Sequence, residues 1–352
     1  MPSLFDPLQL GDITIPNRII MAPLTRSRAG AERIPNKLMA EYYAQRAAAG
    51  LIISEATSVA PMGVGYADTP GLWSTEQVEG WKIVTKAVHN AGGRIFAQLW
   101  HVGRVSAPMF LNGELPVAPS AIRPAGHVSI VRPKQDYVTP RALDIKEIPG
   151  IIEAYRKAAM NAQMAGFDGV ELHGANGYLL DQFLQDGTNH RDDEYGGAIE
   201  NRARLLLEAT DAAASVWGPD LVGVHLAPRG DSHDISDSNK LATFSYVARE
   251  LDERGIAFLC VRERSGNDAV SPALRRLFSG VFIANEGYTA ESAQAALDEG
   301  AADAVAFGKP FIANPDLVAR IRNKAAWNEV DPGTFYAPGP QGYTDYPVLE
   351  TI

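Results

Sequence analysis

The stretch EIPGIIEAYRKAAMNAQMAGFDGVEL, residues 147–172, contains the structural unit that is repeated along this chain. Residues 147–165 are rich in Ala and charged side chains, a composition typical of a helix, and Gly166 follows as a candidate C-cap. The run 168–172 is short and mostly apolar, as in a buried strand. The stretch therefore predicts a helix that leads directly into a strand of a covered sheet.

The same order of helix, glycine and apolar run recurs along the chain. Helical composition is also found at 35–49, 199–216, 241–254 and 290–299, and Thr289 is a candidate N-cap three residues before Ser292. Together with a run at the front of the chain, the apolar segments make eight expected strands, at 18–22, 51–54, 94–99, 168–172, 221–226, 256–261, 281–284 and 303–307.

Eight strands alternating with helices predict a (β/α)8 TIM barrel, of the α/β class. The expected strands lack polar–apolar alternation, which indicates a parallel sheet covered on its outer face, and eight strands are enough to close a barrel. A doubly wound sheet is the alternative. No strand is followed by G-x-G-x-x-G, and the glycines at 63–66 do not have that spacing. The sequence therefore favours one barrel domain over residues 1–352, with no linker that divides it.

Two segments exceed what a minimal barrel needs. Residues 103–146, after the third strand, are rich in Pro and Gly, and we expect them to form a cap or lid over the site. Their β-branched runs at 128–131 and 137–139 suggest a small hairpin. Residues 331–352 are rich in Pro, Gly and Tyr and predict an irregular C-terminal tail packed on the barrel.

Composition limits the class of protein. The 352 residues carry 32 basic and 42 acidic side chains, a net charge of -10 that disfavours nucleic acid and anionic membranes as partners. No apolar run approaches the ~18 residues of a membrane span, and residues 1–10 do not resemble a signal peptide, so we expect a cytoplasmic protein. Cys260 is the one cysteine, which excludes an internal disulfide, a Cys-based zinc site and a cysteine-ligated iron–sulfur cluster.

In a barrel the functional residues lie in the loops after the strands. Six of the expected strands end in polar or glycine residues that are candidates for function: Thr25, Gln98, Trp100, His173, Asn176, Tyr178, His225, Asn285, Gly308 and Lys309. The ends of the seventh and eighth strands, with Gly287, Gly308 and Lys309, suit a phosphate site built from backbone N–H groups. Turn glycines beside a solvated lysine are an equally good interpretation of this local sequence.

The segment HGANGY, residues 173–178, brings an imidazole, an amide and a phenol within six residues. His173 and Asn176 can converge on one oxygen atom, and Tyr178 can donate a proton. A buried structural histidine is the alternative. The seven histidines show neither H-x-H nor H-E-x-x-H spacing and no G-x-S-x-G elbow is found, so a metal site and a nucleophilic triad are disfavoured.

These residues belong to motifs by which the chain resembles the Old Yellow Enzyme family of FMN-dependent ene-reductases, in particular its bacterial N-ethylmaleimide reductase branch. The resemblance extends from about residue 3 to residue 347. It rests on NRIIMAPLTR (17–26), AQLWHVGR (97–104), GVELH (169–173), NGYLLDQFL (176–184), DEYGG (193–197), ENRAR (200–204), AFGKPFIANPD (306–316) and GYTDYP (342–347).

The resemblance implies that FMN lies across the top of the barrel, with NADPH or NADH as hydride donor. Catalytic and substrate-binding roles are implied for His173, Asn176 and Tyr178, and a role in shaping the pocket for Tyr66, Trp100 and Tyr336. Contacts to FMN are implied for Ala22, Pro23, Leu24, Thr25, Gln98, His225, Asn285, Gly287, Gly308, Lys309 and Tyr336.

The implied reaction is the reduction of activated alkenes such as enones and maleimides, with nitro compounds as a further candidate class. Two donors on the substrate oxygen would stabilise enolate-like charge during hydride transfer, and Tyr178 would protonate the α-carbon. NAD(P)H and the alkene would bind in turn at one flavin face, a ping-pong cycle. An oligomer is compatible with this sequence.

The chain departs from the family pattern at three positions. His225 replaces the usual arginine facing the flavin, and because free histidine has a pKa near ~6.5 we expect a lower or pH-dependent flavin potential. Lys309 replaces a phosphate-binding arginine, and Glu286 interrupts the phosphate loop. Two alternatives therefore remain: a flavin carrier without activity, and a flavin-free barrel acting on a sugar phosphate, which would leave Thr25 and Gln98 unexplained.

Overall fold

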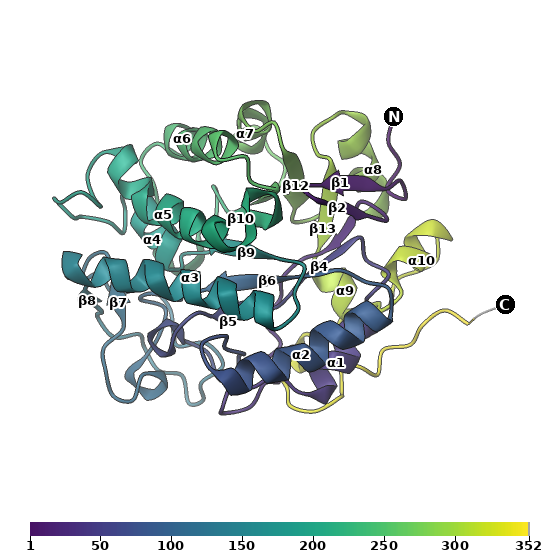
Figure 1. Cartoon of the computed structure of the whole chain (residues 1–352), viewed down its shortest axis with the longest axis horizontal. Coiled ribbons are helices and arrows are strands. Elements are labelled where there is room, and N and C mark those ends of the chain that lie inside the picture. The colour runs from purple at the N-terminus through teal and green to yellow at the C-terminus, as the bar shows by residue number, and fades with distance from the viewer. Residues whose placement is uncertain (351–352) are drawn as a thin grey trace.

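A computed structural model describes residues 1–350 and consists of a closed parallel barrel surrounded by helices (Figure 1). The barrel strands are β3 (Ile19–Met21), β4 (Leu51–Ile53), β6 (Ile95–Trp100), β9 (Gly169–Gly174), β10 (Val222–Leu226), β11 (Phe258–Arg262), β12 (Val281–Asn285) and β13 (Ala304–Phe307). Each strand pairs in parallel with its neighbours, and pairing of β3 with both β13 and β4, and of β4 with β6, closes the ring. The predicted barrel is confirmed, and the doubly wound sheet is excluded.

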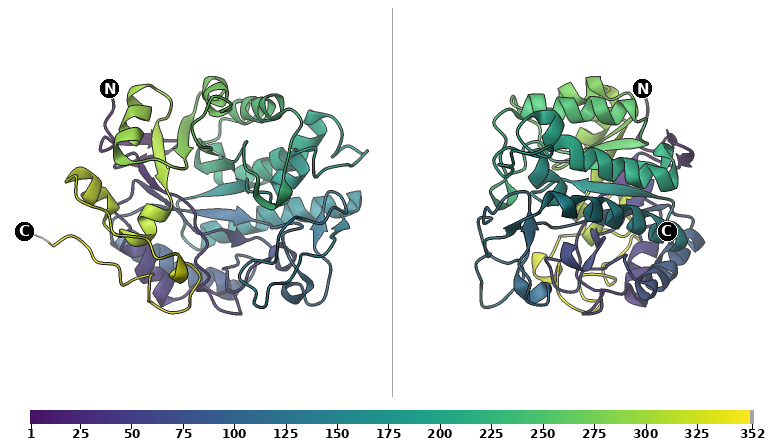
Figure 2. Two further views of the ribbon diagram at one scale, coloured as in Figure 1. Left: turned by 180° about the vertical axis from the view of Figure 1, so that it is seen from behind. Right: turned by 60° about the vertical axis from the view of Figure 1, so that its left-hand side comes forward.

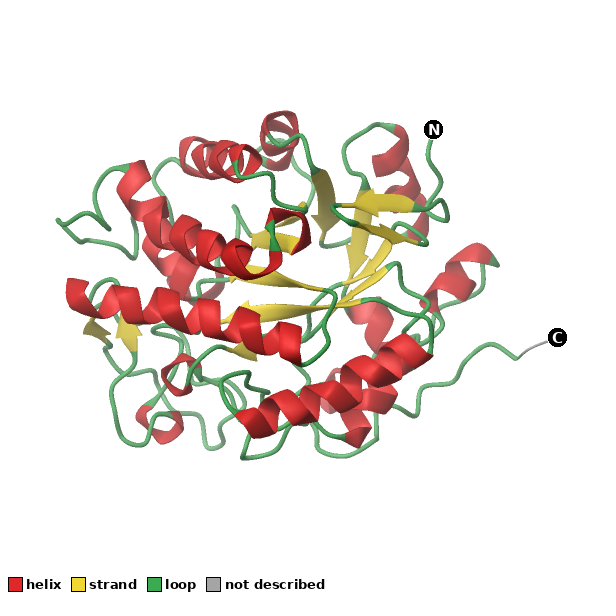
Figure 3. Ribbon diagram, viewed as in Figure 1, coloured by secondary structure: helices red, strands yellow, loops and turns green. Residues whose placement is uncertain are grey.

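The helices cover the outside of the barrel, and Figure 3 shows them around the central strands. They are α1 (Lys37–Ala44), α2 (Thr75–Asn90), α3 (Ile148–Met164), α4 (Leu179–Leu184), α5 (Ile199–Trp217), α6 (Lys240–Glu253), α7 (Ser271–Leu277), α8 (Ala290–Asp298), α9 (Lys309–Ala313) and α10 (Leu317–Arg322). Four of the five expected helices agree to within two residues. The expected helix 35–49 is wrong at its C-terminal end, because residues 45–49 form turns in which the buried Arg46 side chain bonds backbone carbonyls.

Helix α8 shows how local sequence sets an element boundary. The hydroxyl of Thr289 accepts a hydrogen bond from the backbone N–H of Ser292 at 3.2 Å, and the Ser292 hydroxyl accepts one from the N–H of Thr289 at 2.9 Å. This capping box satisfies two N–H groups that would otherwise lack partners at the helix start. The predicted N-cap at Thr289 is confirmed.

Two phenylalanines in the barrel interior require glycine on the neighbouring strand. A Cβ atom added to Gly169 would lie 2.3 Å from Cζ of Phe96, and one added to Gly223 would lie 2.1 Å from Cζ of Phe258. Both phenylalanines are fully buried. Glycine in these two strands is therefore required by the close packing of the core.

An N-terminal hairpin that the sequence analysis did not predict precedes the barrel. It consists of β1 (Leu8–Leu10) and β2 (Ile13–Ile15), with Leu10 and Ile15 buried in the same cluster as the inward-facing residues of the barrel. Gly11 at its turn has φ +52, and a Cβ atom there would lie 1.8 Å from the backbone oxygen of Asp220. The hairpin therefore packs closely on the chain that leads into β10.

The segment 103–146 contains a parallel pair of two-residue strands, β7 (Val117–Ala118) and β8 (Arg141–Ala142). The expected hairpin at 128–131 and 137–139 is wrong: among the described residues, only an isolated bridge between His127 and Asp136 forms there. Ile130 has φ +69, which interrupts an extended run. Val128 and Tyr137 pack instead in a cluster with Tyr66 and Trp100.

The middle of the C-terminal segment 331–350 packs on the N-terminal part of the chain, where Figure 2 shows the yellow segment near the purple one. The Tyr343 ring stacks on Tyr42 with centroids 4.0 Å apart, and Arg26 donates to the backbone oxygen of Gly342 at 2.8 Å. Residues 351–352 of the expected tail lie outside the described residues. Over residues 1–350, no helix combines the length and the apolar character needed to cross a membrane.

Candidate active site

A cavity of about 550 Å³ opens at the C-terminal ends of the barrel strands. Its lining includes eleven of the residues singled out from the sequence: Ala22, Pro23, Leu24, Gln98, His173, Asn176, His225, Asn285, Gly287, Gly308 and Lys309. They come from β3, β6, β9, β10, β12 and β13 and the loops that follow them. The parallel barrel therefore brings together residues up to 287 positions apart in sequence.

Five predicted site residues do not line this cavity: Thr25, Tyr66, Trp100, Tyr178 and Tyr336. Thr25 directly follows the lining residue Leu24, and Tyr336 is a half-exposed residue of the C-terminal segment. Trp100 is fully buried, and its ring is stacked on that of the lining residue His173 at a centroid distance of 6.4 Å.

Tyr178 lies beside His173 at the edge of the cavity. Its ring makes edge-to-face contacts with His173 and with Trp100, each at a centroid distance of 5.0 Å. Its hydroxyl is 2.8 Å from the hydroxyl of Tyr66, close enough for a hydrogen bond. Burial raises the pKa of Tyr178 above that of free tyrosine, so the hydroxyl stays protonated at neutral pH.

The loop that carries Asn176 is held in a left-handed turn. Asn176 has φ +60 and Gly177 has φ +75, a backbone conformation that asparagine and glycine adopt most readily. The carboxylate of Asp181 accepts a hydrogen bond from the Gly177 N–H at 2.8 Å, and the Gln182 amide donates to the Gly177 oxygen at 2.7 Å. These buried side chains fix where Asn176 projects.

His173 is buried and neutral. Burial, followed by the nearby His225 and Arg262 cations, lowers the pKa of His173 well below its ordinary value. Its Nδ1 atom has no hydrogen-bond partner among the described residues. A buried polar atom without a hydrogen-bond partner costs free energy. Such an atom is expected where a bound ligand supplies the missing hydrogen bond.

Beneath His173 lies a buried charge network centred on Glu171. The Glu171 carboxylate accepts a hydrogen bond from Gln98 at 2.7 Å, and its Oε1 lies 3.4 Å from Nδ1 of His225. Nε2 of His225 is in turn 4.0 Å from the sulfur of Cys260. Within residues 1–350, Glu171, His225 and Cys260 could hold a metal ion, because their ligand atoms lie within 4.8 Å of one another. The Glu171 carboxylate and the His225 imidazolium already balance each other in charge without a metal ion.

The neutral His225 expected from the sequence is not supported by this environment. Burial alone would lower the pKa of His225, but Cys260 and the carboxylate of Glu171 raise it to about 10. Burial also raises the pKa of the Cys260 thiol, and the Glu171 carboxylate lies 3.4 Å from Nδ1 of His225. At neutral pH, His225 therefore carries the positive charge that an arginine would carry.

The opposite end of the cavity suits a phosphate. Gly287 has φ +84 with open space where a Cβ atom would lie, so its backbone is accessible. Lys309 is exposed and makes no ion pair with any residue in 1–350. Glu286, at φ +93, directs its carboxylate to two arginines, with Oε2 3.1 Å from Nε of Arg262 and Oε1 3.2 Å from Nε of Arg264. These ion pairs offset the negative charge beside the phosphate end.

Sequence reasoning missed Arg262, which lines the cavity and donates from Nη1 to Oδ1 of Asn176 at 2.7 Å. The expected sixth strand, 256–261, stopped one residue short of the observed end of β11 at Arg262. If the end of this strand had been placed one residue later, Arg262 would have been among the polar residues at strand ends.

These residues fit FMN. Gln98 and the His225 imidazolium present polar groups suited to the edge of a flavin ring, and the backbone around Gly287 and Gly308 with Lys309 presents donors for a phosphate. The unpartnered Nδ1 of the buried His173 points to a further ligand in the same cavity.

Comparison with known proteins gives the same assignment. A family model described as the NADH:flavin oxidoreductase / NADH oxidase family matches residues 3–328. A probable flavin mononucleotide-dependent alkene reductase of Leishmania infantum is 43% identical over 358 residues, covering 98% of this chain and 97% of the relative. Rice 12-oxophytodienoate reductase 1 is 42% identical over 363 residues, covering 99% and 94%.

Two solved structures are also similar. Morphinone reductase in complex with tetrahydroNAD superposes with a TM-score of 0.96 at 51% identity, over 99% of this chain and 98% of that one. The old yellow enzyme homologue from Zymomonas mobilis superposes with a TM-score of 0.97 at 48% identity, over 99% and 100%. The chain therefore belongs to the NADH:flavin oxidoreductase / NADH oxidase family, the family of Old Yellow Enzyme.

Proposed function

We propose that this protein is an FMN-dependent NAD(P)H oxidoreductase that reduces the C=C bond of α,β-unsaturated carbonyl compounds such as enones and maleimides. Nitro compounds are a further candidate class. The observation that carries this proposal is the convergence of His173 and Asn176 on one cavity, with the Tyr178 ring 5.0 Å from the His173 ring. The alkene reductase and morphinone reductase relatives support it.

His173 and Asn176 bind and polarise the substrate oxygen. The neutral imidazole donates one hydrogen bond, and the Asn176 amide donates another from Nδ2, since its Oδ1 already accepts from Arg262. Both donors strengthen their hold as negative charge develops on that oxygen, which lowers the barrier to hydride transfer. When bound, FMN supplies the redox chemistry, accepting hydride from NAD(P)H and delivering it to the β-carbon.

Tyr178 supplies the proton for the α-carbon. Its hydroxyl remains protonated at neutral pH, and the hydrogen bond with Tyr66 orients it. NAD(P)H and the alkene use one cavity in turn, which makes the reaction a ping-pong cycle.

The remaining predicted residues have positioning roles in this proposal. Ala22, Pro23 and Leu24 line the cavity floor beside Thr25, and Tyr336 contributes an aromatic surface from the C-terminal segment. The segment 103–146 acts as a cap, through the packing of Val128 and Tyr137 in the cluster that contains Tyr66 and Trp100. The phosphate of FMN is bound by the residues at the far end of the cavity: Asn285, Gly287, Gly308 and Lys309.

We expect His225 to keep the flavin potential close to that of an arginine variant. Because the pKa of His225 is raised to about 10, the imidazolium persists across pH 5.5 to 8 and is lost only as the pH rises through that value. Redox titrations of wild type and His225→Arg should give parallel slopes across this range. His225→Gln should lower the potential by about 30 mV or more, since ~1.4 kcal/mol corresponds to ~30 mV for a two-electron couple.

A change of slope near pH 6.5 in the wild type, absent from His225→Arg, would instead show that the ring titrates as a free histidine. Glu171→Gln is the matched variant, because it removes the anion that holds the imidazolium and leaves the ring in place. We expect a titration within the measured range to appear in that variant.

The test of the proposed function is an anaerobic two-step mix of the FMN-loaded protein, first with NADPH or NADH and then with 2-cyclohexenone. Bleaching of the flavin absorbance followed by its recovery is the expected result. Binding of FMN without either step would favour the flavin carrier, and a protein that binds no FMN would contradict the cofactor assignment.

A further inference from the structure

Arg262 lines the cavity, and the proposed function leaves it without a role. It is the last residue of β11, and its side chain is 36% exposed. Its guanidinium donates from Nη1 to Asn176 and bonds the Glu286 carboxylate through Nε at 3.1 Å and Nη2 at 3.4 Å. A guanidinium has five N–H groups, so two remain for a ligand.

Arg262 lies next to the substrate end of the cavity, because it contacts Asn176. Asn176, whose oxygen it contacts, follows β9 and is one of the two proposed donors to the substrate carbonyl. The charge of Arg262 is also close enough to contribute to the lowered pKa of His173, the second donor. Arg262 also borders the phosphate end, since it pairs in register with Asn285 at the end of β12 and bonds Glu286.

Most of the charged groups that line the cavity are cations. Arg262, Arg264, Lys309 and His225 line it, and Glu286 is the one carboxylate among its described lining residues. Glu171, outside the lining, balances the His225 imidazolium. Glu286 is shared between Arg262 and Arg264 and so offsets one of these two cations. A phosphate bound beside Lys309 would offset charge at that end of the cavity, so the case for a second anion rests on the contact of Arg262 with Asn176.

We propose that Arg262 forms a subsite for a carboxylate on the substrate, so that the enzyme prefers activated alkenes that carry an anionic group near the activating carbonyl. A carboxylate matches the geometry of free guanidinium N–H groups and forms charge-assisted hydrogen bonds with them. The substrate's carbonyl oxygen would then lie on His173 and Asn176 and its carboxylate on Arg262. This inference rests on the proposed function and names its substrate class.

The experiment compares two forms of one alkene, trans-2-oxo-3-pentenoate and its methyl ester, with the FMN-loaded enzyme and saturating reduced nicotinamide. In this alkene the carboxylate is attached to the activating carbonyl. The measured quantity is the ratio of kcat/KM for the acid to kcat/KM for the ester, compared between wild type and variants. Taking this ratio within each enzyme removes the intrinsic difference in reactivity between the two compounds.

Arg262→Gln should lower the acid-to-ester ratio about 10- to 100-fold, the usual size of the loss when a hydrogen bond to a charged group is removed. The loss should lie mainly in KM for the acid, and Arg262→Lys should restore part of it. The rate of flavin reduction by NADPH should change much less than the acid-to-ester ratio. FMN content is measured in each variant, because Arg262 pairs in register with Asn285 and bonds Glu286 beside the phosphate end.

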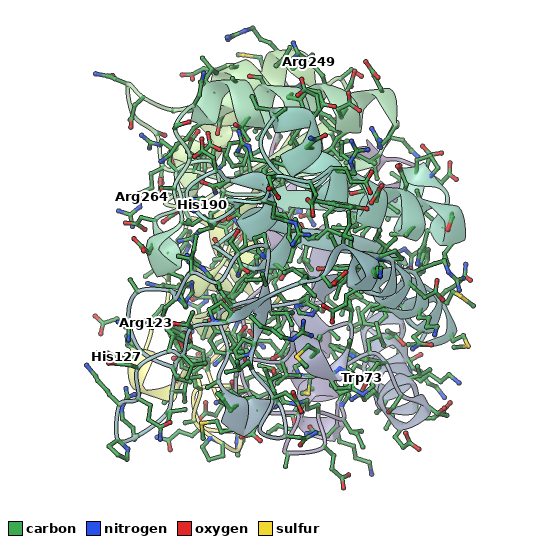
Figure 4. The ribbon with its side chains drawn as sticks, turned by 90° about the vertical axis from the view of Figure 1, so that its left-hand side faces the viewer. Trp73, Arg123, His127, His190, Arg249 and Arg264 are labelled. Carbon is green, nitrogen blue, oxygen red and sulfur yellow. The ribbon has the colours of Figure 1, made fainter. Side chains whose placement is uncertain are left out.

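Arg264→Gln is the matched control. It makes the same change of charge and loses the same partner, Glu286. Arg264, however, does not hydrogen-bond Asn176, and its side chain is 77% exposed, at the outer surface in Figure 4. We expect the acid-to-ester ratio of this variant to stay within about twofold of wild type.

An unchanged ratio in Arg262→Gln would overturn the inference, as would equal losses in the Arg262 and Arg264 variants, which would indicate a general field effect. Weaker FMN binding with an unchanged ratio would assign Arg262 to the cofactor instead. These outcomes leave the proposed function intact as long as wild type reduces the ester and 2-cyclohexenone. If NADPH bleaches the flavin absorbance of the wild-type enzyme but the enzyme then reduces no alkene, the proposed function itself fails, and this inference fails with it.

Discussion

His173→Ala is expected to slow hydride transfer to 2-cyclohexenone by about 10²- to 10³-fold, the usual effect of removing one donor from a developing oxyanion. Flavin reduction by NAD(P)H should fall much less, because no enolate-like charge develops in that half of the cycle. Stopped-flow measurement of the two half-reactions separates the two effects. His173 contacts Trp100, so FMN content and thermal stability are measured alongside.

His173→Asn provides the control for this prediction, because it keeps a hydrogen-bond donor while removing the imidazole. We expect it to recover part of the oxidative rate. Equal losses in both half-reactions of His173→Ala would contradict a specific role on the substrate oxygen and would indicate that the ring chiefly supports the structure around Trp100.

Tyr178→Phe is expected to slow the oxidative half-reaction by about 10²- to 10⁴-fold, the range for a lost general acid, and to leave the reductive half-reaction nearly unchanged. The phenyl ring keeps the edge-to-face contacts with His173 and Trp100, so the packing is preserved. Because burial raises the pKa of Tyr178, the wild-type oxidative rate should not depend on tyrosine ionisation between pH 6 and 9.

Tyr66→Phe is the matched control, since it removes the other hydroxyl of the 2.8 Å pair but not the proton donor. Its effect on the oxidative half-reaction should be well below that of Tyr178→Phe. If the two variants lose the same activity, Tyr66 would be as good a candidate for the donor as Tyr178.

Much of the site followed from local sequence together with one rule of barrels. Glycines that end helices marked where each strand begins, and residues at strand ends were assigned to one face. The rule placed His173, Asn176, Gln98, His225 and Lys309 around a single cavity, as the structure shows. The rule missed Arg262, because the end of its strand was placed one residue too early. The separate prediction of a hairpin from 128–131 and 137–139 was wrong, because Ile130 adopts a left-handed backbone conformation.

The departures from the family pattern have a different meaning once the neighbours of each residue are known. Glu286 would oppose phosphate binding if it were alone, but Arg262 and Arg264 neutralise it. His225 would be neutral if it were free, but Glu171 holds it as an imidazolium. These contacts weaken the case for a flavin carrier without activity.

The sequence by itself determined the barrel, the order of its strands and the residue types at the strand ends, because helix caps, buried strands and turns depend on residues close together in the chain. Only the tertiary structure decided the charge of His225, the direction of Glu286 and the partner of Asn176. Each depends on a contact between different strands, such as that of Arg262 with Asn176 across 86 positions. Electrostatic interactions act over distances in space, and the spacing of residues along a chain does not determine those distances.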